Sequence, residues 1–198
     1  MSEIANYAEL KKEFGEYASW AIWADGKNHT DGIGDWSVLT DENILHNANT
    51  DYVFVGLNAA EHDQKTELVA WCNFHSKDSK QKDYKLRCAL KETKFWGAYM
   101  TDIIKGYEKT ESAAVMEFIK NNPQKYEKDL ECFRREMQLL AGDKKPILIA
   151  MGGDPYKLLR PLKKEGFEVK QITHYAARYR YSNLEYYIAR VREKLGIK

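Results

Sequence analysis

The chain has 198 residues and a formal net charge of +1, and 43% of its residues are hydrophobic, which excludes a disordered chain and suits one α/β domain. No apolar run approaches the ~20 residues that span a bilayer, and the N-terminus lacks the basic and apolar parts of a signal peptide. Cys72, Cys88 and Cys132 have no CxxC spacing, which indicates free thiols. We therefore expect a cytoplasmic protein without a membrane partner.

The first 50 residues are expected to lie outside the main core. The pattern of Ile4–Trp20 predicts a helix, and Ala21–Asn49, rich in Trp, Asp, Gly and Asn, predicts an extended segment that wraps the sheet. Trp20, Trp23 and Trp36 would anchor this segment by packing against the sheet. Residues 51–198 are then the α/β core of a single domain.

From residue 52 onward, apolar runs alternate with helical patterns. Buried strands are predicted at Tyr52–Leu57, Gly97–Ile103, Pro146–Met151 and Phe167–Ile172. Helices are predicted at Asp83–Lys94, Ser112–Asn121, Gln124–Leu140, Asp154–Lys164 and Ser182–Leu195. This alternation predicts a three-layer α/β/α sandwich around a parallel sheet of about four strands.

Polar residues stand at or near the ends of the first two strands, where α/β proteins place their ligands. Gly56 permits a tight turn or a close backbone approach, and Asn58 offers both a donor and an acceptor. Asp102 places a carboxylate in an apolar run, where it needs partners. It would bind a ligand or serve as a local cap.

The loop after the first strand carries Phe74 and His75, which would contact a planar ligand or join the core. His62 and His75 match no common metal spacing, so no metal is expected. Gly152 and Gly153 form neither GxGxxG nor a P-loop, so no nucleotide cofactor is expected.

The fourth strand ends at His174, and Arg178, Tyr179, Arg180 and Tyr181 follow it. Residues 156–198 carry eleven Lys/Arg and four Asp/Glu. Arginine binds phosphates and tyrosine stacks on bases, so a nucleic-acid contact is predicted here, with a solvated helix surface as the alternative.

In their order along the chain, these motifs resemble the uracil-DNA glycosylase superfamily over about residues 50–195. They are the strand ending Gly-Leu-Asn-Ala-Ala, the loop aromatic Phe74, the strand Gly-Ala-Tyr-Met-Thr-Asp-Ile-Ile-Lys, the run Ile-Leu-Ile-Ala-Met-Gly-Gly and the late His174. The first motif is similar to Gly-x-Asn-Pro-Gly and the last to His-Pro-Ser-Pro of the mismatch-specific and single-strand-selective branches.

The resemblance implies a glycosylase-like fold that acts on a base flipped out of single-stranded or mismatched DNA. It gives Asn58 the role of positioning water, and His174 that of supporting the leaving base through a hydrogen bond and positive charge. Phe74 would stack on the base, and Asp102 would read its edge beside Gly56 and His75. Arg178 and Arg180 would hold phosphates.

The chain departs from the family pattern at three places. Ala59-Ala60 replaces Pro-Gly, Tyr175-Ala176-Ala177 replaces Pro-Ser-Pro, and Asp102 stands where an asparagine is usual. An ionised carboxylate only accepts hydrogen bonds, so it suits an amino-bearing base edge better than a uracil carbonyl. Two alternatives remain: a non-catalytic nucleobase- or nucleic-acid-binding protein of the same fold, and a small-molecule hydrolase that uses an Asp102/His174 pair.

Overall fold

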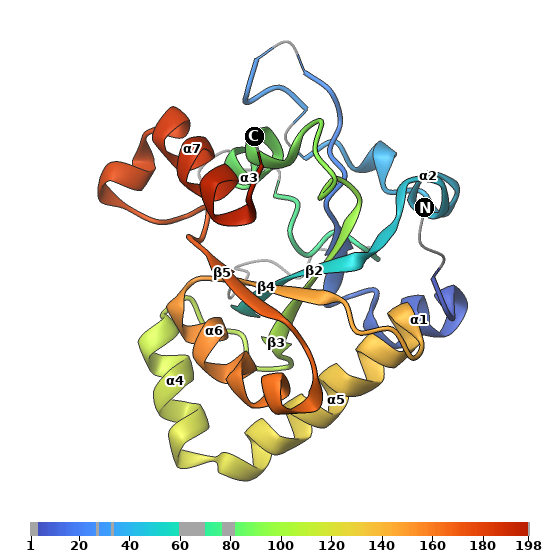
Figure 1. The fold of residues 1–198 in the computed structure, drawn as a ribbon, viewed down its shortest axis with the longest axis vertical. Helices are drawn as coiled ribbons and strands as arrows, with labels where there is room; N and C mark the ends of the chain where they lie inside the picture. Colours follow the sequence, from blue (N-terminus) through green and yellow to red (C-terminus); the bar gives the residue numbers. More distant parts are fainter. Residues whose placement is uncertain (1–3, 27, 33, 60–69, 77–81, 198) are drawn as a thin grey trace.

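A five-stranded sheet lies at the centre of the computed structural model, which describes residues 4–26, 28–32, 34–59, 70–76 and 82–197 (Figure 1). The strands are β1 (Ala18–Trp20), β2 (Asn49–Asn58), β3 (Ala98–Ile104), β4 (Ile147–Met151) and β5 (Val169–Ile172), in the spatial order β1-β3-β2-β4-β5. β1 is antiparallel to β3, and the other neighbours are parallel. The expected sheet of about four parallel strands therefore gains an antiparallel edge strand.

Helices cover both faces of this sheet (Figure 1). They are α1 (Tyr7–Phe14), α2 (Asp41–Asn47), α3 (Tyr84–Leu90), α4 (Ser112–Asn121), α5 (Pro123–Ala141), α6 (Gly153–Leu159) and α7 (Leu184–Leu195), with 3-10 turns η1 (Trp36–Val38), η3 (Arg160–Glu165) and η4 (Tyr179–Ser182). α5 and α6 pack on one face, while α7 packs against β5 and α3 on the other. No helix in the described ranges is long and apolar enough to cross a membrane.

Two cores form because successive side chains of a strand point to opposite faces. Val53 and Val55 of β2 belong to the core that contains Phe133 of α5. Phe54 belongs to the other core, together with Leu86 of α3. The same alternation decides which polar residues at the strand ends share a face.

The N-terminal segment is part of the sheet, which corrects the prediction that it lies outside the core. The helix predicted at Ile4–Trp20 ends at Phe14, and the chain turns into β1. Trp20 is fully buried, and its ring meets the rings of Tyr99 and Trp71 edge-on at 5.0 and 5.8 Å. Aromatic packing and pairing with β3 thus override the helical pattern.

The following segment also contains structure that its sequence did not predict, because η1 and α2 lie within residues 36–47. Arg87 of α3 anchors the part before them. Its guanidinium donates to the carbonyl oxygens of Ala24, His29 and Asp31 at 2.9, 2.7 and 2.6 Å. Ala24, His29 and Asp31 are therefore held against α3 by a buried arginine.

Candidate functional site

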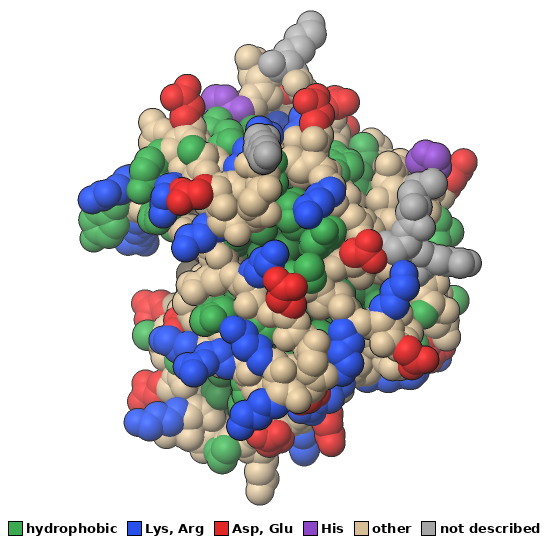
Figure 2. Space-filling view, viewed as in Figure 1, with side chains coloured by type: hydrophobic (Ala, Val, Ile, Leu, Met, Phe, Trp, Pro, Cys, Tyr) green, Lys and Arg blue, Asp and Glu red, His purple; other side chains and the backbone are tan. Residues whose placement is uncertain are grey.

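The carboxyl ends of the parallel strands β2, β3, β4 and β5 lie on the same side of the sheet (Figure 1). Figure 2 shows the surface hollowed on the left, between the segment of η4 and α7 above and α4 and α6 below. Lys and Arg side chains border this hollow on both sides. This is the edge at which open α/β sheets bind ligands.

Gly56 and Asp102 are register partners in β2 and β3, and their closeness explains the glycine. A Cβ atom at residue 56 would lie 2.2 Å from Asp102 Oδ1 and 3.3 Å from Cε1 of Phe74. Any larger residue would displace the carboxyl group, so Gly56 serves a close approach rather than a tight turn. The structure thus brings together Gly56, Phe74 and Asp102.

The Asp102 carboxyl is buried, with 4% of the residue exposed. Its Oδ2 accepts a hydrogen bond of 3.0 Å from Nδ2 of Asn73, which also donates to the carbonyl of Tyr17. Burial raises the pKa of Asp102 to about 7, while the Asn73 amide and the charge of Lys105 oppose this rise. Near neutral pH the group therefore exchanges between an acceptor-only carboxylate and a carboxylic acid that can also donate.

Asn58 lies two residues further along β2 and is half-buried. Its Nδ2 is within hydrogen-bond distance of the carbonyl oxygens of Ala59, Tyr107 and Lys109, at 2.8, 3.1 and 2.8 Å. These acceptors fix which way the amide points. Within the described ranges no donor bonds its Oδ1, which is therefore oriented and free to accept.

His174 follows β5 and is half-buried beside Tyr175, with ring centroids 4.2 Å apart. Its Nδ1 accepts from the backbone N–H of Ala176 at 3.1 Å, which leaves Nε2 as the protonated nitrogen of the neutral ring. Burial lowers the pKa of His174 to about 4, and the charge of Lys85 adds to this shift. The expected positive charge of His174 is therefore corrected: at neutral pH the ring offers a hydrogen bond only.

His75 faces the N-terminal segment. Its Nε2 lies 3.0 Å from the carbonyl oxygen of Trp20, its ring packs on Trp23 at 5.1 Å, and its own carbonyl accepts from Trp36. Burial lowers the pKa of His75 to about 4, so the ring is neutral and Nε2 donates. These contacts favour an anchoring role over the base-binding role that the sequence predicted.

The segment after His174 is exposed at the upper border of the hollow. Arg178 and Arg180 are both exposed, and neither forms an ion pair with any residue that the structure describes. Tyr179 between them is 92% exposed and has a φ of 58°, a backbone conformation that is uncommon for a bulky side chain. Two free guanidinium groups thus flank a projecting aromatic ring.

No protein-family model, curated protein or solved structure matches this chain. The described residues contain no group of three or more His, Cys, Asp or Glu that could hold a metal ion, and His62 lies outside them.

Two buried charged residues near this edge were not predicted from the sequence. Asp83 precedes α3, a position where an aspartate usually caps the helix. Its side chain forms no capping hydrogen bond, and the residue is 2% exposed. Lys85 is fully buried, its Nζ donates to the carbonyl of Tyr181 at 2.5 Å, and it lies 5.0 Å from the ring centroid of Tyr187. Lys85 therefore ties α3 to η4, and only the fold reveals it.

Proposed function

We propose that this protein binds a flipped-out nucleobase at the carboxyl edge of its sheet and hydrolyses the N-glycosidic bond, as the resemblance to the uracil-DNA glycosylase superfamily implies. The observation that carries the proposal is the meeting of Gly56, Phe74 and Asp102. Further along β2 lies the amide oxygen of Asn58, to which no donor bonds among the residues that the structure describes. These are an aromatic ring that is 6% exposed and lies in the core, a buried edge-reading group and an oriented acceptor.

Chemistry on a base in a duplex requires its nucleotide to leave the stack. Phe74 would then pack on the base, and Oδ1 of Asn58 would accept a hydrogen bond from a water directed at the anomeric carbon. The C–N bond breaks with its electron pair going to the base, the water oxygen bonds to the carbon, and the water's proton passes to solvent. Nε2–H of His174 would donate to the departing base, a stabilisation worth a few kcal/mol.

The second candidate is a nucleobase-binding protein of the same fold without hydrolytic activity. Asn58 favours it, because an amide orients a water but cannot take its proton. The replacement of Pro-Ser-Pro by Tyr175-Ala176-Ala177 also favours it.

Base excision from oligonucleotides, single-stranded and mismatched, tests the proposal, and Asp102→Asn makes the test sharper. At pH 8 the carboxyl is mostly ionised and meets a uracil carbonyl acceptor to acceptor. The mismatch costs about 1–3 kcal/mol, so Asp102→Asn should increase uracil excision or uracil binding roughly tenfold to hundredfold. Strong uracil excision by the wild type that falls in the Asn variant would contradict this reading. Excision by neither protein, from any oligonucleotide, would favour the non-catalytic candidate.

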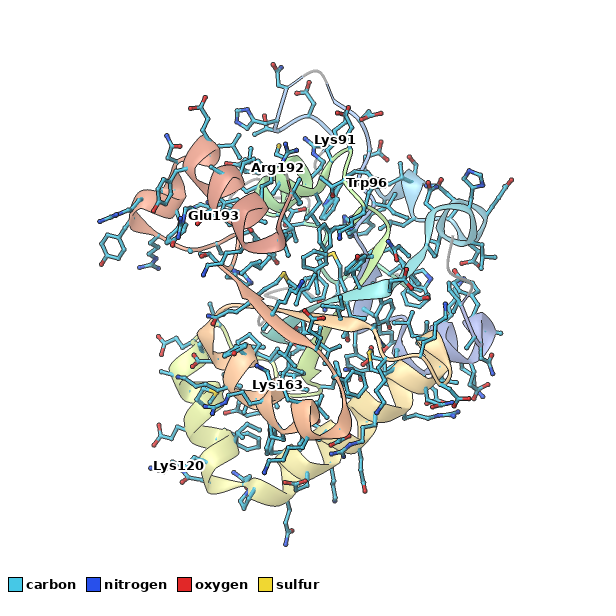
Figure 3. All side chains as sticks on the ribbon, viewed as in Figure 1. Lys91, Trp96, Lys120, Lys163, Arg192 and Glu193 are labelled. Atoms are coloured by element: carbon cyan, nitrogen blue, oxygen red, sulfur yellow. The ribbon has the colours of Figure 1, made fainter. Side chains whose placement is uncertain are left out.

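Arg178 and Arg180 are expected to contribute sequence-independent affinity for DNA. Replacing both with alanine should weaken binding similarly across sequences and flatten the salt dependence by roughly two charges' worth. The matched control replaces Lys120 and Lys163, which Figure 3 places on the lower helices away from η4. If the salt dependence of DNA affinity changes equally in the two double variants, Arg178 and Arg180 are not the phosphate contacts.

A further inference from the structure

An exposed tyrosine projects from the turn η4, at the border of the hollow. Tyr179 is 92% exposed, and its φ of 58° places it in the left-handed region, where a bulky side chain is strained. Glycine would adopt this backbone conformation at lower cost. Residues held in strained conformations cluster at ligand-binding sites, so the exposed ring is a candidate ligand contact.

Hydrogen bonds hold the turn on its inner side. Lys85 is fully buried, and its Nζ donates to the carbonyl oxygen of Tyr181 at 2.5 Å. The backbone N–H of Asn183 donates to the carbonyl oxygen of Arg180 at 3.2 Å. The backbone of the turn is therefore fixed, while the side chain of Tyr179 stays in solvent.

Positive charge stands on both sides of this ring in the sequence. Arg178 and Arg180 are exposed, and no ion pair joins either of them to another residue in the part of the chain that the structure describes. Figure 2 shows Lys and Arg side chains beside hydrophobic ones where this segment projects at the left of the molecule. The order of cation, ring and cation matches a ligand in which negative charges alternate with flat rings.

A nucleic-acid strand has this alternation, because phosphates and bases repeat along it. Aromatic side chains stack on bases, and arginine binds phosphates. In a duplex the faces of each internal base are covered by the neighbouring base pairs, so only an unstacked base offers a face to Tyr179. The chemistry of the turn therefore fits a single strand better than a duplex.

We propose that Arg178, Tyr179 and Arg180 form a platform for single-stranded nucleic acid, in which Tyr179 stacks on a base and the two arginines bind the adjoining phosphates. The backbone N–H of Ala177 donates to the carbonyl oxygen of His174 at 3.0 Å, which ties the start of this segment to the candidate site. The inference rests on the proposed function for nucleic acid as the ligand. It adds Tyr179 as a contact and the single strand as the preferred form.

The test is an equilibrium titration of the full chain with three probes: a short oligonucleotide of mixed sequence, the same oligonucleotide paired with its complement, and a single strand of equal length without bases. The wild type should bind the single strand more tightly than the duplex, by about fivefold or more. Tyr179→Ala should weaken binding of the single strand about fivefold to hundredfold, the loss expected for one stacked base. It should leave the affinity for the duplex and for the strand without bases unchanged, and Tyr179→Phe, which keeps the ring, should bind like the wild type.

The salt dependence separates the ring from the charges beside it. The Tyr179 side chain is neutral, so Tyr179→Ala should lower the single-strand affinity by the same factor at each salt concentration, unlike the arginine variants. Leu45→Ala is the matched control, because Leu45 is the other exposed large hydrophobic residue in the described ranges, at 54%, and lies on α2, far from α7 in Figure 1.

The inference is overturned if the duplex binds as tightly as the single strand, if neither binds, or if Tyr179→Ala loses no more single-strand affinity than Leu45→Ala. Because Tyr179 is exposed, its variants should fold, and urea denaturation checks this. Base excision by a protein whose single-strand affinity does not depend on Tyr179 would overturn the platform and leave the glycosylase proposal standing. A single-strand preference that depends on Tyr179, without excision from any oligonucleotide, would support the platform and remove the hydrolytic step.

Discussion

Replacing Asn58 with alanine is expected to lower the rate of base excision by about 10²–10³, the loss typical of removing one preorganised polar group from an active site. The effect is large because Nδ2 is committed to backbone carbonyls, including those of Tyr107 and Lys109, so Oδ1 is held in one direction without further reorganisation. Single-turnover excision from a substrate that the wild type cleaves measures this rate.

The stability of the Asn58→Ala variant should fall by only about 1 kcal/mol, because the variant loses hydrogen bonds at the border of the sheet rather than core packing. Asn49→Ala is the matched control. Asn49 stands at the opposite end of the same strand, and its Nδ2 also donates to a backbone carbonyl, that of Lys94, at 2.7 Å. If Asn58→Ala excises the base as fast as Asn49→Ala does, Asn58 has no role in the hydrolysis.

The parallel strands and most helices could be predicted because their apolar runs are local signals. The run Tyr52–Leu57 lies within β2, and the helix predicted at Ser112–Asn121 is α4 with the same bounds. Pro123 separates α4 from α5, since it occupies the first turn of α5, where its missing N–H costs nothing.

The edge strand β1 could not be predicted, because nothing within Ala18–Trp20 distinguishes it from a continued helix. Its three residues pair with Tyr99–Thr101 of β3, which follow them by 79 to 83 residues in the sequence. Tertiary pairing of this kind overrides local propensity. The sequence alone therefore could not show that part of the first ~50 residues joins the sheet, and only the three-dimensional structure does.

The residues of the candidate site likewise fall into two groups, those that the sequence could predict and those that it could not. Gly56 and Asp102 were found because they interrupt or end apolar strands, and the register then puts one opposite the other. Asp83 and Lys85 were missed because a residue that begins a helix and a lysine within it are ordinary surface features in sequence. Only burial distinguishes them, and burial likewise decides that His174 is neutral.

The largest loss of stability is expected from replacing Lys105, which lies on the face of the sheet opposite to the candidate site. Lys105 Nζ forms a buried ion pair of 2.7 Å with Glu136 Oε2, in which the side chains are 8% and 0% exposed. Lys105→Met would leave the Glu136 carboxylate among apolar groups, and of the side chains in the described part of the chain only the hydroxyls of Tyr99 and Thr101 would still donate to it. Breaking such a pair from one side should lower the free energy of unfolding by about 3–5 kcal/mol, measured by urea denaturation at pH 8.

The control for Lys105→Met is Lys11→Met, which removes an ion pair of the same 2.7 Å length. The side chains of Lys11 and Asp41 are 39% and 48% exposed, so solvent screens the pair and the loss should stay below about 1 kcal/mol. Equal losses in the two variants would show that burial does not set the strength of the Lys105 pair.

Lys105 also connects the two faces of the sheet, because its Nζ donates to the backbone carbonyl of Asp102 at 2.7 Å and its charge lowers the pKa of the Asp102 carboxyl. Lys105→Met should therefore raise the pKa of Asp102 above its value of about 7 in the wild type, a shift that NMR titration of the carboxyl carbon would detect. The carboxyl would then be mainly protonated at neutral pH and able to donate to a carbonyl oxygen. A variant that remains folded should thus shift its base preference towards uracil at neutral pH, although Lys105 itself belongs to the other side of the sheet.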